Sequence, residues 1–467
     1  MSQEYSLRSV TSFKKNKVPL TYEDFNEGGM SLGFVNKLDW LDVTVKQKEN
    51  QIKYKVTSIV NFAEWLIGFD KVAVKDDFGY IWNGSYWQSM PVKNIFNMID
   101  VSILTIADRL QLSANKKREL QRDVKPILIE QSRNFDNTAK SGYIAFKNWT
   151  LNISQNNFFP PNKEMNLIDG FDFEPDETGE EPTTWIAYAD YMFGNNSKFL
   201  WAWLGYSFQT NMNWRQGALF LLDPIGGTGK THFVTKITQA MFGEKRVGAF
   251  KLKNLQGNNA RFETARFVGK AIMVDDDATR VRFKEDDTFK SITGGGLSPV
   301  ERKGVDGTEY RITSKMIINV NEMPIVNNAG AIKRRLHIIK TQAPVATAQE
   351  ISKRNALFLE EDLENEIPRL ATYAIEMYQK AVLEDWHVQN SIVDDIVAQD
   401  PFVTWHETLK PGLISASELY MSYTDFYDTK FASKSEDDKP MSNTAWGRKM
   451  ANWNEKVITR EGRFYKI

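Results

Sequence analysis

The sequence predicts an α/β fold, in which a parallel β-sheet is flanked by helices, preceded by an α+β region and followed by a small domain of helices and a hairpin. Three apolar, strand-like runs carry this prediction: residues 219–222, 270–274 and 315–320. The first is followed by a glycine-rich turn, the second by three aspartates and the third by an asparagine. Because parallel strands end at one edge of a sheet, we expect these polar residues to meet there.

Length and composition exclude several classes of protein. A chain of 467 residues should hold about three domains. It has 59 basic and 60 acidic residues, so any contact with nucleic acid must come from local patches. The lack of cysteine excludes disulfides and thiolate zinc sites, and with them a zinc-ribbon primase. No run is long enough to span a membrane and residues 1–12 lack a signal-peptide core, so we expect a soluble protein with no membrane partner.

Four regions are expected along the chain. Residues 1–175 form the α+β region, in which two aromatic strands around Asn83-Gly84 predict a hairpin. Residues 176–345 hold the sheet and a preceding helical collar, residues 346–397 a helical connector, and residues 398–467 the small C-terminal domain. An acidic, proline-containing passage from 172 to 181 has the composition of a linker and separates the first two.

The segment from 219 to 231 has the pattern of a phosphate-binding loop, a strand that breaks into Gly-Gly-Thr-Gly-Lys-Thr and then a helix. Its glycines allow backbone N–H groups to surround phosphate oxygens at the positive end of the helix dipole. Pro224 stands where the motif usually has glycine, and proline suits a turn. The expected ATP-binding residues are Gly226, Gly227, Thr228, Gly229, Lys230 and Thr231. Thr231 is also expected to bind Mg²⁺.

The second and third strands supply the expected catalytic groups. Asp275 and Asp276 are expected to bind Mg²⁺ and to polarise the attacking water, with Asp277 taking part if the register differs by one residue. Asn321 can hydrogen-bond the γ-phosphate or the water and so sense hydrolysis. Arg334 and Arg335, just before a further strand at 336–339, could reach the nucleotide of a neighbouring subunit.

The segment from 292 to 304 runs from three glycines to Arg302 and Lys303. It has the composition of a hairpin tip that carries two cations. Repeated around a ring, such tips would line a channel and hold a DNA backbone without reading its bases.

In this order, these motifs resemble superfamily 3 helicases, the AAA+ ring motors of small DNA viruses, phages and mobile genetic elements such as pathogenicity islands. Residues 143–159 also resemble the region before the motor in phage and poxvirus primase–helicases, with Trp149 in place of a usual glycine. The resemblance implies an AAA+ P-loop ATPase core and a hexameric DNA helicase that moves 3′ to 5′. It also implies Arg302 or Lys303 on the pore hairpin and Arg334 or Arg335 as an arginine finger acting in trans.

The C-terminal region predicts two helices followed by a hairpin that turns at Glu461-Gly462, which is the plan of a winged helix. Residues 442–450 would be the recognition helix. From 444 to 467, six cations stand against the acids Glu455 and Glu461. The cations are Arg448, Lys449, Lys456, Arg460, Arg463 and Lys466. We expect Arg448, Lys449, Arg460 and Arg463 to bind DNA, although a domain that only braces the ring remains open. This region also resembles the winged helix of phage and satellite replication proteins.

Taken together, these features predict a replication initiator and DNA helicase that uses ATP and Mg²⁺ in the cytoplasm of a bacterial host cell. Single-stranded DNA would lie in the ring and the duplex origin on the C-terminal domain. A separate primase or host replisome proteins would be needed, because no nucleotidyl-transfer pattern is present. Two alternatives stay open: an ATP switch or helicase loader that does not unwind DNA, and a viral RNA helicase.

Overall fold

The computed structural model describes residues 39–46, 51–68, 71–138, 140–176, 178–278, 282–283, 287–302, 305–322, 325–326, 332, 334–388, 401–430, 439–460 and 462–467. The chain forms two compact units, Met1–Glu174 and Pro175–Ile467. Among the described residues, no helix combines the length and the apolar character that crossing a bilayer requires.

The first unit is an α+β body. Its elements are β1 (Leu41–Lys46), β2 (Gln51–Val56), α3 (Ile59–Ile67), β3 (Val72–Lys75), β4 (Phe78–Trp82), β5 (Trp87–Pro91), α4 (Val92–Arg109), α5 (Ala114–Gln131), β6 (Tyr143–Phe146), β7 (Trp149–Asn152) and β8 (Asn157–Phe159). Strands β4 and β5 pair antiparallel, with Trp82 opposite Trp87, so the hairpin expected around Asn83-Gly84 is confirmed. The Asn83 side chain accepts the N–H groups of Ser85 and Tyr86 and stabilises the turn.

The second unit contains a five-stranded parallel sheet with the order β10-β11-β15-β9-β17. Its strands are β9 (Ala218–Leu222), β10 (Val247–Ala249), β11 (Ile272–Ala278), β15 (Lys315–Val320) and β17 (Leu336–Lys340). The sheet confirms the predicted parallel α/β core. Strand β11 continues through the aspartates that were expected to follow it.

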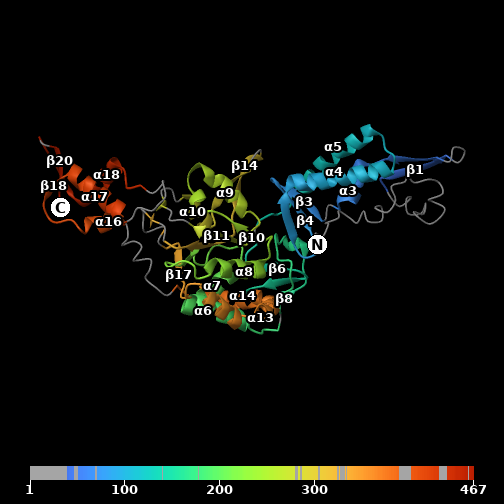
Figure 1. Ribbon diagram of the computed structural model, residues 1–467. Helices are drawn as coiled ribbons and strands as arrows, with labels where there is room; N and C mark the ends of the chain where they lie inside the picture. The colour runs from blue at the N-terminus through green and yellow to red at the C-terminus, as the bar shows by residue number, and fades with distance from the viewer. Residues whose placement is uncertain are drawn as a thin grey trace. The chain divides into compact units, whose positions relative to one another are not determined.

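Helices cover both faces of this sheet (Figure 1). The surrounding helices are α6 (Thr183–Phe193), α7 (Ser197–Tyr206), α8 (Lys230–Phe242), α9 (Ala260–Thr264), α10 (Asp287–Gly294), α12 (Ala348–Leu357), α13 (Glu360–Asn365) and α14 (Ile367–Leu383). Alternate residues of β15, Met316, Ile318 and Val320, lie in one core cluster with Phe289 and Ile292 of α10. Since neighbouring residues of a strand point to opposite faces, Asn319 points to the other face.

The segment expected to be a helical connector is largely part of the packed body. Helix α14 packs closely on α7, where a Cβ on Gly205 would lie 1.9 Å from the Ala374 carbonyl oxygen. Glu366, just before α14, accepts the backbone N–H groups of Thr184 and Trp185 at the start of α6. Residues 389–400 lie outside the described part of the chain.

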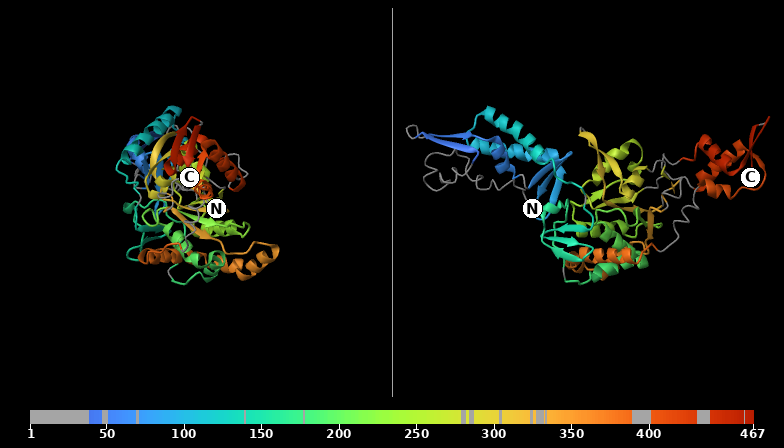
Figure 2. Two further views of the ribbon diagram at one scale, coloured as in Figure 1. Left: turned by 90° about the vertical axis from the view of Figure 1, so that its left-hand side faces the viewer. Right: turned by 180° about the vertical axis from the view of Figure 1, so that it is seen from behind.

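Two further pieces complete this unit. Strands β13 (Leu297–Arg302) and β14 (Val305–Arg311) form an antiparallel hairpin beside α9 (yellow in Figure 2). Residues 401–467 comprise α16 (Pro401–His406), β18 (Leu413–Ser415), α17 (Ala416–Lys430), α18 (Asn443–Trp453), β19 (Glu455–Thr459) and β20 (Gly462–Lys466). These pack around their own aromatic core, which includes Trp405, Tyr423 and Trp446. Thr459 pairs with Gly462, so the hairpin turns one residue earlier than expected.

Candidate nucleotide site and nucleic-acid interface

The glycine-rich turn joins the buried strand β9 to helix α8. Gly226, Gly227 and Gly229 have φ angles of 76°, 72° and 88°, a region that side chains with a Cβ rarely adopt. These angles explain why glycines occupy the turn. An anion placed there would lie at the N-terminus of α8.

The turn is held from inside by Asp223, which sequence reasoning missed. Its carboxylate is buried and accepts the Gly226 N–H at 3.0 Å, the Thr228 N–H at 3.3 Å and the Thr228 hydroxyl at 2.8 Å. An aspartate directly before a turn signal is typical of side chains that accept from the next few backbone N–H groups. That pattern could have identified it.

Lys230, the first residue of α8, is buried against the sheet. Its ammonium donates to the carbonyl oxygens of Leu221 at 3.1 Å and Val320 at 2.7 Å. Burial lowers the pKa of Lys230 to about 8, and the negative charges of Asp223 and Asp277 partly oppose this. A phosphate at the loop would give the ammonium a counter-charge.

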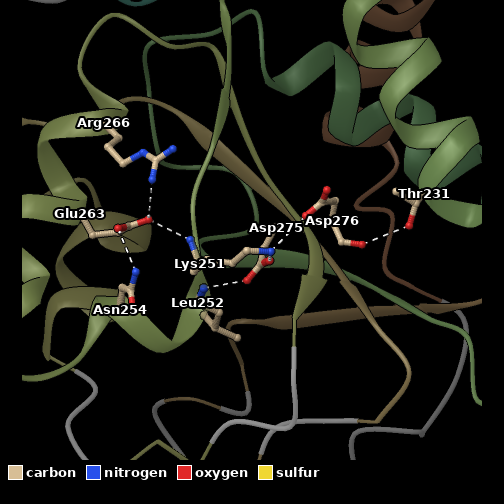
Figure 3. Close-up of polar contacts among 8 residues, drawn as sticks. All are labelled: Thr231, Lys251, Leu252, Asn254, Glu263, Arg266, Asp275 and Asp276. Carbon is tan, nitrogen blue, oxygen red and sulfur yellow. Dashed lines mark hydrogen bonds and ion pairs between the residues drawn. The ribbon is translucent and has the colours of Figure 1, made fainter.

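Thr231 of α8 contacts strand β11 near its exposed end. The Thr231 hydroxyl donates to the Asp276 carbonyl oxygen at 3.1 Å (Figure 3). The side chain of Asp276 is 59% exposed, whereas that of Asp275 is 1% exposed. A bulge between Asp275 and Ala278 brings Asp276 and Asp277 together at the exposed end of β11.

Asp275 differs from its expected place. Its carboxylate accepts the Leu252 N–H at 2.7 Å and forms an ion pair with Lys251 at 2.9 Å, both in the segment after β10. Met273, two residues earlier on the same strand face, lies in the core cluster that also contains Leu252. Asp275 is therefore engaged in supporting the strand, whereas Asp276 and Asp277 are exposed.

One asparagine lies in β15 and a second directly follows that strand. Asn321 is exposed and directly follows Val320, whose carbonyl accepts from Lys230. Asn319 is 1% exposed, and neither polar atom of its amide has a hydrogen-bond partner among the described residues. A buried amide without partners costs free energy, which is typical of a functional site rather than of a core.

The two arginines before β17 are in different environments. Arg335 is buried, and its Nε donates to the Thr293 hydroxyl at 3.1 Å within the same chain. Arg334 is exposed. Of the pair that the sequence left open, Arg334 is therefore the one whose side chain is accessible. Lys333 lies outside the described residues.

A second cation beside the loop was also missed from the sequence. Arg354 of α12 lies so close that a Cβ on Gly229 would be 2.3 Å from its Nη1. The preceding segment is tied to the loop, because the Ala346 N–H donates to the Gly227 carbonyl at 2.7 Å. Nothing in the spacing of residues 346–354 indicated this return to the loop.

The donor set fits a magnesium nucleotide. Lys230 and the N-terminus of α8 are suited to phosphates, while the Thr231 hydroxyl and the Asp276 carboxylate are the hard oxygen ligands that Mg²⁺ prefers. The unpartnered Asn319 amide leaves hydrogen-bonding capacity on the same side of the sheet.

Residues 222–335 match a family of unknown function, DUF5906. Among solved structures, the chain is similar to two apo structures of the NrS-1 C-terminal region, with a TM-score of 0.34 and identities of 14% and 15%. In both cases 63% of this chain and 79% of the other are covered. It is also similar to JCV helicase with a bound thiazolopyridine compound, with a TM-score of 0.27, 10% identity, and coverage of 44% and 62%. No curated protein matches the chain.

The expected DNA-binding residues of the hairpin are described only in part. Arg302 is the last residue of β13, but its side chain lies outside the described residues, as does all of Lys303. The hairpin itself is confirmed by the antiparallel pairing of β13 with β14.

The four cations expected to bind DNA in residues 401–467 are placed differently from one another. Arg448, on α18, is exposed, as are Arg460 and Arg463 at the turn between β19 and β20. Lys449 lies over the Phe402 ring, 4.7 Å from its centroid, and is half-buried. Part of its charge is therefore already engaged by a cation–π contact.

Proposed function

We propose that the protein is an ATP-dependent DNA helicase and replication initiator that uses Mg²⁺. One observation carries the proposal: Lys230, Thr231, Asp276 and Asn321 come together from α8, β11 and the residue after β15, at the carboxyl edge of one parallel sheet. That edge is where open α/β sheets bind nucleotides.

Each group has a task in phosphoryl transfer. The loop N–H groups and Lys230 would hold the phosphates, and Thr231 with Asp276 would hold Mg²⁺, which would supply positive charge beside the transferred group. Asp277 or Asp276 polarises the attacking water, and Asn321 senses the γ-phosphate. The exposed Arg334 acts on the nucleotide of the adjacent subunit, which requires a ring, and we propose a hexamer.

The β13–β14 hairpin is the proposed DNA contact of the motor. In a ring its tips carry Arg302 and Lys303 toward single-stranded DNA in the channel and hold its backbone. Movement is proposed to run 3′ to 5′, as the superfamily 3 resemblance implies.

Residues 401–467 are proposed to form a winged helix that binds duplex origin DNA. The order helix, strand, helix, helix and hairpin, with β18 paired to β20, supports this. Helix α18 would enter the major groove with Arg448, and Arg460 and Arg463 would hold the phosphate backbone. A separate primase, or the replisome of a bacterial host, would complete replication in the cytoplasm.

Unwinding of two partial duplexes tests the proposal, one with a 3′ and one with a 5′ single-stranded tail. Wild type should open the 3′-tailed substrate with ATP, and Lys230→Ala should open neither. ATP hydrolysis without unwinding of either substrate would contradict the helicase assignment and favour a DNA-bound ATP switch or helicase loader. Hydrolysis stimulated by RNA rather than by DNA would instead favour an RNA helicase.

A further inference from the structure

Lys251 follows β10 and contacts the carboxylates of two neighbouring residues of β11 (Figure 3). Its ammonium lies 2.9 Å from a carboxylate oxygen of Asp275 and 3.1 Å from one of Asp276. Asp275 is buried and structural, whereas Asp276 is exposed beside Thr231. Lys251 therefore connects the proposed Mg²⁺-side acid to the interior of the unit.

The backbone of this segment is held by two buried acids. The Leu252 N–H donates to Asp275 at 2.7 Å, and the Lys251 N–H donates to Glu263 of α9 at 2.8 Å. Glu263 is buried and also accepts from the Asn254 amide at 3.2 Å. Because both acids bind neighbouring N–H groups, a shift of Lys251 and Leu252 pulls on α9 as well as on β11.

Helix α9 is in turn bonded to the hairpin. The Thr264 hydroxyl donates to the Pro299 carbonyl at 2.6 Å, and Arg261 pairs with Glu301 at 2.8 Å. Glu301 directly precedes Arg302, the last residue of β13. Described contacts thus run without a break from Asp276 to the end of the strand that leads to the proposed DNA contact.

We propose that Lys251 is a positioning residue that couples Asp276 to the β13–β14 hairpin through α9. The inference rests on the proposed function, since it needs a nucleotide at the loop and DNA at the hairpin. When Asp276 serves a nucleotide-bound Mg²⁺, Lys251 loses one of its two acid partners and is repelled by the divalent cation. It then moves toward Asp275, and the hydrogen bonds to Glu263 carry that movement to α9.

The direct test is to measure whether binding of DNA changes the affinity for ADP. This measurement does not require ATP hydrolysis. The affinity of full-length protein for ADP with Mg²⁺ is measured with and without saturating oligothymidylate. For wild type, the ratio of these two affinities should be roughly 5- to 150-fold, the usual range of coupling between two sites. In Lys251→Met, which keeps the stem without the charge, the ratio should fall to about 1.

Three further variants make the test specific. Glu301→Ala, at the far end of the path, should also reduce the ratio, and the double variant with Lys251→Met should lose no more than the single ones. Lys253→Met is the matched control, because Lys253 is exposed in the same turn and should keep the wild-type ratio.

Three outcomes would overturn this inference without affecting the proposed function. They are a wild-type affinity ratio in Lys251→Met, an equal loss of the ratio in Lys253→Met, and the absence of any coupling in wild type. Failure of wild type to bind either ADP or the oligonucleotide would overturn the proposed function as well.

Discussion

Among single residues, Asp223 holds the glycine-rich turn in its shape. Asp223→Ala leaves the N–H groups of Gly226 and Thr228 without their carboxylate acceptor, and a lost hydrogen bond to a charged group costs about 1.5–3 kcal/mol. We expect ADP affinity to fall at least about tenfold, measured by calorimetric titration. Asp223→Asn keeps an acceptor oxygen, so its affinity for ADP should lie between those of wild type and Asp223→Ala. Tighter binding by Asp223→Ala would mean that the carboxylate competes with phosphate for the loop.

Lys230 gives a pH dependence to the same site. With a pKa of about 8 in the nucleotide-free protein, its ammonium is present below that pH and is lost as the pH rises. Of the two forms of Lys230, only the charged ammonium attracts phosphate. The affinity for ADP should therefore be constant below pH 8 and fall about tenfold per pH unit above it. The chain has no cysteine to titrate in this range. The measurement is a series of ADP-binding titrations from pH 7 to roughly 9.5. Equal affinity throughout this range would contradict the role of the Lys230 ammonium.

Secondary-structure elements were predictable where apolar runs were long and bounded by turn residues. Strand β15 occupies the predicted residues 315–320, and the Asn83-Gly84 hairpin forms as expected. The orientation of Asp275 was not predictable, because the bulge that separates it from Asp276 and Asp277 has no sequence signal of its own. Contacts between distant segments were also hidden, since nothing in its spacing places Arg354 beside the loop. Asp223, in contrast, directly precedes the turn, and that local pattern could have identified it.

Helices α7 and α14 pack too closely to admit a side chain at Gly205. A Cβ on Gly205 would lie 1.9 Å from a backbone carbonyl of α14, so Gly205→Ala must separate the two helices. Overpacking of this kind costs about 1–3 kcal/mol, and thermal unfolding should begin several degrees lower. Gly447→Ala, in α18, is the control. Its Cβ would meet only the Tyr465 hydroxyl at 3.8 Å, so no loss of stability is expected. Equal melting temperatures for the Gly205 variant and wild type would contradict the packing.

For the whole molecule, the proposed role of the exposed Arg334 requires a neighbouring subunit. Arg334→Ala and Lys230→Ala should each be inactive alone, but mixed rings contain interfaces with both an intact loop and an intact arginine. ATP hydrolysis should therefore be partly restored on mixing. Arg335→Ala should instead lower thermal stability, because Arg335 is buried and bonded to Thr293 of its own chain. If mixing restores nothing, the sites do not lie between subunits.

Steady-state ATP hydrolysis by wild type, Lys230→Ala and Lys236→Ala tests whether this loop is a nucleotide site. Lys236 lies on the same helix and pairs with Glu360 away from the loop, so its variant controls for the loss of a lysine from α8. We expect Mg²⁺-dependent turnover by wild type and Lys236→Ala, and a rate lower by roughly 100-fold or more in Lys230→Ala. Wild-type turnover by Lys230→Ala, or none by wild type, would contradict a nucleotide site at this loop.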